Sequence, residues 1–271
     1  MRVAVLAPIQ NSPYSRLVTF LAQQEPDIEV TQIVVRSIWS WNRFKGDLRR
    51  DGIRLINKVY KKLILGGQAY KDYHGQTILD MAQTSNLPGR NLEDIAKQFD
   101  IPILTVTDHN DEKSIEALLS RRPDLILFTG GGLLRKKILD IPLLGVVNCH
   151  AGILPRYRGM DVIEWAILEA EDNPPQTGLT LHFMDRGVDT GPILKTYPLN
   201  LLPHETIEEF RVRIEPEMVK LVIHGVRGIR DGKLEGTPQK KSGGKQYFIM
   251  HPRVKEAAEN KLKKMSFQRE K

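Results

Sequence analysis

The sequence predicts an α/β protein: a mostly parallel β-sheet covered by helices on both faces. Short apolar segments rich in valine and isoleucine alternate with segments of helical spacing, which is the pattern of β-α-β units. Residues 124–129 (DLILFT) are almost wholly apolar, as expected of a strand buried on both faces. The 271 residues, 41% hydrophobic and 27% charged, suit one large domain or a domain of about 200 residues with a smaller one.

Each element of the first half follows from local periodicity and turn residues. Residues 2–7 form a valine-rich run closed by Pro8, which predicts a buried strand leading into a helix. Asn91 is a suitable N-cap for a short helix. The predicted strands are 2–7, 29–35, 103–106, 124–129 and 144–148, and the predicted helices are 14–24, 92–99, 114–120 and 136–140.

Residues 37–80 are long for a connection and are predicted to be a basic insertion. Residues 36–71 carry ten Lys and Arg against two Asp, and residues 238–271 carry ten against three acidic residues. Within the first block, residues 49–65 have the apolar spacing of an amphipathic helix, which suits contact with a membrane surface. Both blocks indicate anionic partners such as phosphates, nucleic acid or a membrane, or else solvated helix faces.

The second half predicts further strands and helices. A helix is expected over 161–171, with strands over 177–184 and 193–199. Thr206 and Glu209 predict a capping box for a helix that Pro216 breaks or kinks, with a second helix running to about Arg230. A β-hairpin over 237–250 and a basic helix from Pro252 complete the predicted extension. We therefore expect a catalytic domain over 1–200 and an extension over 201–271.

The cellular setting predicted by the sequence is the cytoplasm. A single cysteine, Cys149, excludes an intrachain disulfide and favours a reducing compartment. The first residues lack the basic and long apolar regions of a signal peptide, and no apolar stretch has the length of a membrane span.

The polar residues around the predicted strand 144–148 carry the chemical signal. Asn148 and His150 lie two residues apart at the end of that strand, so their side chains point to the same side of an extended chain. Asp189 lies in a glycine-flanked loop between two later strands, which would bring it near His150. These types suit acyl transfer between nitrogens. An amide stabilises the oxyanion, a histidine moves protons or stabilises charge, and a carboxylate orients the histidine or a water.

Three motifs together resemble the formyltransferases that use 10-formyltetrahydrofolate, a family acting on glycinamide ribonucleotide, methionyl-tRNA and sugar nucleotides. The motifs are Asn148-x-His150, the segment Leu154-Pro-Arg-Tyr-Arg-Gly159, and the segment Val188-Asp-Thr-Gly-Pro192. The resemblance covers residues 90–200 and the first strand. It implies a Rossmann-like fold, a catalytic trio of Asn148, His150 and Asp189, and 10-formyltetrahydrofolate as formyl donor without a metal.

The resemblance also implies a folate pocket. Its first wall would be Gly131, Gly132, Leu133 and Leu134, whose backbone would hydrogen-bond the pteridine; an ordinary strand-to-helix turn is the alternative. The loop containing Asp185, Arg186, Gly187 and Val188 would form the other wall. Arg156 and Arg158 are candidates for a substrate phosphate or for structural ion pairs. Asp108-His-Asn-Asp111 has the residue types of metal ligands but is more typical of a loop with a helix cap, and Cys149 is expected to be buried and inert.

The acceptor is expected to be an amino-sugar nucleotide or another small amine, nucleotide-linked or lipid-linked. The loop Ala7–Pro13 lacks the glycines that cradle phosphate in glycinamide ribonucleotide enzymes, and the residues after Asn200 are few for the barrel of methionyl-tRNA enzymes. Those two acceptors stay as alternatives. By similarity to sugar-nucleotide enzymes, the C-terminal part would support a homodimer. A nucleic-acid-binding protein and a non-catalytic folate or nucleotide sensor are the readings from other classes.

Overall fold

The computed structural model describes residues 1–37, 70, 73–171 and 174–268. The strands are β1 (Arg2–Ala7), β2 (Glu29–Arg36), β3 (Ile103–Val106), β4 (Leu125–Phe128), β5 (Gly145–His150), β6 (Tyr157–Gly159), β7 (Gly178–Phe183), β8 (Ile193–Pro198) and β9 (Lys245–Tyr247). The helices are α1 (Pro13–Gln24), α5 (Ile78–Thr84), α6 (Leu92–Phe99), α7 (Glu112–Arg121), α8 (Lys136–Leu139), α9 (Val162–Glu169), α10 (Ile207–Arg230) and α11 (Pro252–Gln268). The predicted amphipathic helix over 49–65 and most of the predicted insertion lie outside the described residues.

The sheet has seven strands in the order β3-β2-β1-β4-β5-β7-β8. The strands from β3 to β5 run parallel, while β7 pairs antiparallel with both β5 and β8. The predicted α/β class with a mostly parallel sheet is therefore confirmed. The antiparallel pair extends the sheet beyond β5, the strand that carries Asn148 and His150.

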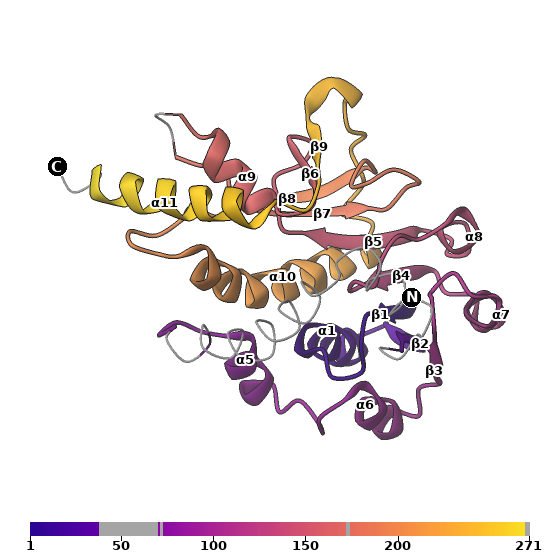
Figure 1. Ribbon diagram of the computed structural model, residues 1–271. Coiled ribbons are helices and arrows are strands. Elements are labelled where there is room, and N and C mark those ends of the chain that lie inside the picture. Colours follow the sequence, from indigo (N-terminus) through magenta and orange to yellow (C-terminus); the bar gives the residue numbers. More distant parts are fainter. Residues whose placement is uncertain (38–69, 71–72, 172–173, 269–271) are drawn as a thin grey trace.

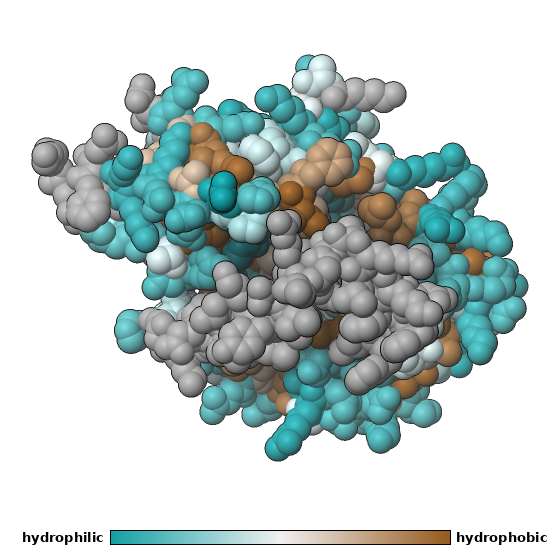
Figure 2. Space-filling model, in the orientation of Figure 1, coloured by the Kyte–Doolittle hydropathy of each residue, from teal (hydrophilic) through white to brown (hydrophobic). Residues whose placement is uncertain are grey.

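Helices cover both faces of the sheet, as the alternation along β1 requires (Figure 1). Val3 and Val5 face a core built with α1, α6 and α10, whereas Ala4 and Leu6 face a second core built with α7 and α8. Because strand side chains alternate, one apolar run supplies both cores. On the face drawn in Figure 2, hydrophilic side chains predominate and apolar ones lie in small separate areas.

Helix α10 differs from the prediction because it runs unbroken through Pro216. The predicted capping box at Thr206 and Glu209 forms, with reciprocal hydrogen bonds of 3.1 and 2.8 Å. Proline removes one helix hydrogen bond and costs about 3 kcal/mol. Here Pro216 is buried in the apolar face that packs α10 against α1 and β7, and burial of that face offsets the loss. The predicted break at Pro216 was therefore wrong, while a kink there stays a prediction. A domain boundary at residue 200 stays a prediction.

The C-terminal β-hairpin was also predicted wrongly. Strand β9 pairs in parallel with β6, and Thr237 instead forms an antiparallel bridge to Ile193. Glycine permits the close approach of β6 and β9, since a Cβ on Gly159 would lie 2.2 Å from the carbonyl oxygen of Tyr247. The rings of Tyr157 and Tyr247 then pack with centroids 5.7 Å apart. Pairing with β6 thus replaces the pairing expected within the hairpin.

No helix among the described residues combines the length and apolar character needed to cross a membrane.

Candidate active site

Strands β5 and β7 bring the predicted polar residues together. Strand β5 extends two residues further than predicted and contains both Asn148 and His150, because β7 pairs with it there. Their register partners are His182 and Thr180, respectively. Since Asn148 and His150 are two residues apart in a strand, their side chains share one face of the sheet.

The loop between β7 and β8 places Asp189 between two histidines. One carboxylate oxygen, Oδ2, lies 3.5 Å from Nδ1 of His150, and the other, Oδ1, lies 3.6 Å from Nε2 of His182. The backbone N–H of Gly159 donates a 2.8 Å hydrogen bond to Oδ2. Asp189 has a left-handed φ of 53°, which aspartate tolerates better than most residues. The structure thus unites Asn148, His150 and Asp189, the three predicted catalytic residues.

His150 is 8% exposed and is held by the backbone of β6. Its Nε2 lies 2.8 Å from the carbonyl oxygen of Tyr157, so Nε2 carries a hydrogen and donates it. Nδ1 consequently faces the carboxylate of Asp189, 3.5 Å from Oδ2. Gly152 leaves space for the ring, because a Cβ there would lie 2.8 Å from Nε2. His150 and Asp189 therefore form an imidazole–carboxylate pair.

His182 is a site residue that the sequence analysis missed. It is 1% exposed, and its Nδ1 donates to the carbonyl oxygen of Phe183 at 2.8 Å. Its Nε2 lies 3.3 Å from the amide nitrogen of Asn148. Burial lowers the pKa of His182, although the carboxylate of Asp189 acts to raise it. A neutral His182 accepts one amide hydrogen of Asn148 and fixes which way that amide points.

A signal for His182 was present in the sequence. The strand Gly-Leu-Thr-Leu-His-Phe is apolar except at Thr180 and His182, which are two residues apart and so lie on one face. Thr180 donates to the carbonyl oxygen of Gly152 at 2.7 Å and accepts the N–H of Leu154 at 3.1 Å. Thr180 therefore fixes the segment that follows His150, and His182 contacts Asn148, two residues before His150.

A cavity of about 540 Å³ lies where β3 and β4 end and beside the loop after β7. Six of the eight residues predicted for the folate pocket line it: Leu133, Leu134, Asp185, Arg186, Gly187 and Val188. The remaining lining residues are Asp108, Asn110, Arg135, Lys136 and Met184. Gly131 and Gly132 lie in the turn before Leu133 and do not line the cavity. Asp185 also fixes its own loop, because Oδ1 accepts the N–H of Gly187 at 2.9 Å and the hydroxyl of Thr190 at 2.6 Å.

The remaining candidates lie outside this cavity. Arg156 is exposed, donates to Gln176 at 3.2 Å and lies over the ring of Tyr157. Arg158 donates to the carbonyl oxygen of Gly244 at 2.6 Å. Arg156 precedes β6, the strand that contacts His150, and Arg158 lies within it. Phosphate binding by these arginines stays a prediction. Cys149 is 6% exposed, and burial raises the pKa of its thiol, as expected for an inert side chain.

The polar cluster at 108–111 has the geometry of a loop. Oδ2 of Asp111 accepts the backbone N–H groups of Thr107 and Asp108 at 3.1 and 2.9 Å. Asp111 also precedes α7 as its N-cap residue. Across the described part of the chain, no group of three or more His, Cys, Asp or Glu side chains has a metal-binding arrangement.

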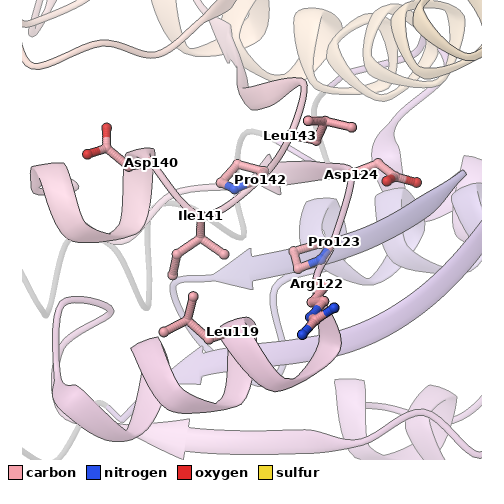
Figure 3. A pocket seen from close by; sticks show the side chains of 8 residues that line it. All are labelled: Leu119, Arg122, Pro123, Asp124, Asp140, Ile141, Pro142 and Leu143. Carbon is pink, nitrogen blue, oxygen red and sulfur yellow. The ribbon is translucent and has the colours of Figure 1, made fainter.

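A second cavity, of about 520 Å³, lies at the starts of β4 and β5 (Figure 3). Leu119, Ile141 and Leu143 are among its lining residues, with Arg122 and Asp124 beside them. None of the predicted site residues lines it. Ligands of parallel sheets bind at the opposite, carboxyl ends of the strands, which favours the first cavity as the candidate site.

Comparison with known proteins points to one family. Residues 65–226 match the family model described as formyl transferase. The chain is 35% identical over 152 residues to a methionyl-tRNA formyltransferase of Pelobacter propionicus, covering 56% of this chain and 47% of that protein. The chain spans about half the length of the curated relatives it matches.

Solved structures share the fold at low identity. A sugar N-formyltransferase from Shewanella sp. superposes with a TM-score of 0.58 at 11% identity, covering 97% of this chain and 87% of that one. A phosphoribosylglycinamide formyltransferase from Anaplasma phagocytophilum gives a TM-score of 0.57 at 18% identity, covering 92% and 99%. At these identities the likeness is one of fold.

Proposed function

Because the chain belongs to the formyl transferase family, we propose that it transfers a formyl group from 10-formyltetrahydrofolate to an amine. The observation that carries this proposal is the grouping of Asn148, His150 and Asp189 on one side of the sheet. The match over 65–226 contains all three motifs on which the family resemblance rested, and that resemblance is confirmed.

In this proposal the three side chains divide the work of acyl transfer. One amide hydrogen of Asn148 faces His182, and the planar amide holds the other in a fixed direction, where it stabilises negative charge that develops on the formyl oxygen. The His150–Asp189 pair takes up the proton that the attacking amine loses and returns a proton to the leaving nitrogen of the donor, directly or through a water, so that the pair ends as it began. His150 cannot rotate freely because Nε2 is bound to the carbonyl of Tyr157.

In this proposal the donor occupies the cavity bounded by Leu133, Leu134 and Val188. The donor, when bound, supplies the formyl carbon. The exposed Leu133 and the partly buried Met184 and Val188 offer apolar contact to a flat ring, while Asp108 and Asp185 add polar groups at its edge. Such a combination of apolar walls and few polar groups is typical of small-molecule sites.

For the acceptor we propose an amino-sugar nucleotide or another small amine. The first loop, Ala7–Pro13, has no glycine for a phosphate cradle, which disfavours glycinamide ribonucleotide. The described residues after α10 pack back on the catalytic core: β9 pairs with β6, and α11 packs on α9. Because these C-terminal elements pack on the core, they favour a small acceptor over a tRNA.

Methionyl-tRNA stays the second candidate, and one specific observation favours it. The curated relatives with 30–35% identity carry that name. Two basic segments, 36–71 and 238–271, would suit a nucleic-acid substrate. A non-catalytic nucleic-acid-binding role would show salt-dependent binding without turnover.

The experiment is a panel of acceptors incubated with 10-formyltetrahydrofolate. The panel contains amino-sugar nucleotides, glycinamide ribonucleotide and charged initiator tRNA, and mass spectrometry reports the addition of one formyl group. His150→Ala is the loss-of-activity variant and His224→Ala, an exposed position on α10, is the matched control. A formylated amine that depends on His150 supports the proposal. Folate binding without any formylated product would overturn the enzyme proposal in favour of a sensor.

A further inference from the structure

The loop Thr107–Asp111, which follows β3, forms one side of the proposed donor cavity. Within this loop, Asn110 contacts the segment 133–135, which forms another wall of the cavity. Its Nδ2 donates to the carbonyl oxygen of Leu133 at 2.9 Å, and its Oδ1 accepts the backbone N–H of Arg135 at 2.7 Å. A single side-chain amide therefore bridges the backbone on both sides of Leu134, as a neighbouring strand would.

Asn110 is itself held firmly. Oδ1 of Asp108 accepts the backbone N–H of Asn110 at 2.9 Å and its Nδ2 at 2.7 Å. The other oxygen of Asp108 lies 4.0 Å from the guanidinium of Arg36. Burial acts to raise the pKa of Asp108, but the hydrogen bonds from Asn110 and the charge of Arg36 together lower it. Asp108 is thus an ionised acceptor, and both hydrogens of the Asn110 amide have partners.

The glycine turn before Leu133 is supported from the same direction. Gly131 has a φ of 121°, and a Cβ at this position would lie 2.6 Å from Cε1 of His109 and 2.9 Å from Cδ of Arg36. His109 is 1% exposed, so its ring is a fixed support. Position 131 requires glycine for two reasons: the positive φ of its backbone and the close approach of these two side chains. The turn therefore rests on His109 and Arg36, and Asn110 fixes the segment that follows it.

We propose that Asn110 is a positioning residue for the formyl donor, because it fixes the backbone from Leu133 to Arg135 that forms one wall of the cavity. This role rests on the proposed function. Leu134 is 7% exposed and anchors the segment in the core, whereas Leu133 is 70% exposed beside the cavity. The carbonyl of Leu133 and the N–H of Arg135, on either side of Leu134, are hydrogen-bonded to one amide. The wall therefore keeps its shape before the donor arrives, and donor binding loses less conformational entropy.

The test measures donor binding without any acceptor. Calorimetry with folinic acid, a formyl-carrying relative of the donor, compares the wild-type chain with Asn110→Ala and with Asn260→Ala, an exposed position on α11. Loss of two backbone hydrogen bonds is expected to raise the Kd roughly 10-fold or more in Asn110→Ala, and Asn260→Ala should bind as the wild type does. Unchanged circular dichroism establishes that the variant is folded.

Hydrogen exchange at Arg135 supplies a second measurement that needs no ligand. The Arg135 amide should exchange faster in Asn110→Ala, since its acceptor is gone. Unaltered exchange at Arg135, or an unaltered Kd in a folded variant, overturns the positioning role alone. If the wild-type chain itself fails to bind folinic acid, the proposed donor and the positioning role fall together.

Discussion

The backbone N–H of Gly159 donates a 2.8 Å hydrogen bond to Oδ2 of Asp189. Two residues earlier on the same strand, the carbonyl oxygen of Tyr157 accepts Nε2–H of His150. Strand β6 therefore fixes both members of the His150–Asp189 pair through its backbone. Because β9 pairs with β6, residues beyond the family match at 226 also support the candidate catalytic residues.

Replacing Asp189 by asparagine should remove the carboxylate that faces His150 while preserving the side-chain shape. We expect kcat for formyl transfer to fall by roughly 10²- to 10⁴-fold, the usual size of a general acid–base contribution. Folinic acid should still bind, because Asp189 does not line the cavity proposed for the donor. The measurement is steady-state formylation of the acceptor found in the panel. Asp231→Asn, at an exposed position paired with Arg230, is the control. Full activity of Asp189→Asn would remove the carboxylate from the mechanism.

Gln239 should control the position of Asp189 from the C-terminal segment. Its Nε2 donates to the carbonyl oxygens of Asp189 and Gly191 at 3.0 and 2.6 Å, so one amide spans the turn at Thr190. Gln239→Met keeps the length of the side chain and removes both donors. We expect kcat to fall about 10-fold or more while KM for the donor changes little.

The control for Gln239 is Gln246→Met, at an exposed position on β9 that makes the same chemical change. Equal kcat values for the two variants would show that the turn needs no support from Gln239. A rise in KM alone would indicate donor binding rather than positioning of Asp189.

The sheet was predictable because almost wholly apolar runs such as 2–7 and 124–129 are stable only when both of their faces are buried. Runs of this kind predict the strands of a parallel sheet, and the structure has five parallel strands. Asn148, His150 and Asp189 were predictable because a family motif specifies them together. The pairing of β9 with β6 was not, since it depends on two glycines, Gly159 and Gly244, whose missing side chains let distant backbones meet. Local patterns favoured a hairpin instead.

Two further site residues escaped prediction because contacts between distant segments position them. His182 and Asn110 act through contacts with segments 34 and about 25 residues away, and only the folded chain brings those segments together. From residue type alone, His182 was predicted as part of a strand and Asn110 as part of a helix-capping loop. The hydrogen bonds themselves leave no spacing pattern in one sequence, although the polar pair of Thr180 and His182 on an apolar strand was a signal for His182.

The thiol of Cys149 should react only after unfolding. It lies on β5 in the larger apolar core, 6% exposed, and burial raises its pKa, so little thiolate forms near neutral pH. We expect a thiol reagent to modify the native chain orders of magnitude more slowly than the chain in denaturant. Cys149→Ala should retain formyl transfer within about twofold and cost about 1 kcal/mol of stability. Rapid modification of native protein, with loss of activity, would place this thiol in the reaction.

Acid should destabilise the fold through His109. Burial lowers the pKa of this ring to about 4, against the raising effect of its bond to the carbonyl of Ala7. In the unfolded chain the pKa returns to about 6.5, so between these values the unfolded state binds a proton that the folded state does not. The stability from a neutral His109 is therefore complete above pH 6.5 and is lost as the pH falls toward 4.

The measurement is urea unfolding of wild type and His109→Gln at pH 7.5 and 4.5. Between these pH values the wild type should lose about 2–3 kcal/mol more than the variant, whatever the variant's absolute stability. His224→Gln, whose ring is exposed on α10, should follow the wild type. Parallel losses in wild type and His109→Gln would mean that His109 takes up its proton in the folded state, and the support it gives to the turn at Gly131 would then carry a charge.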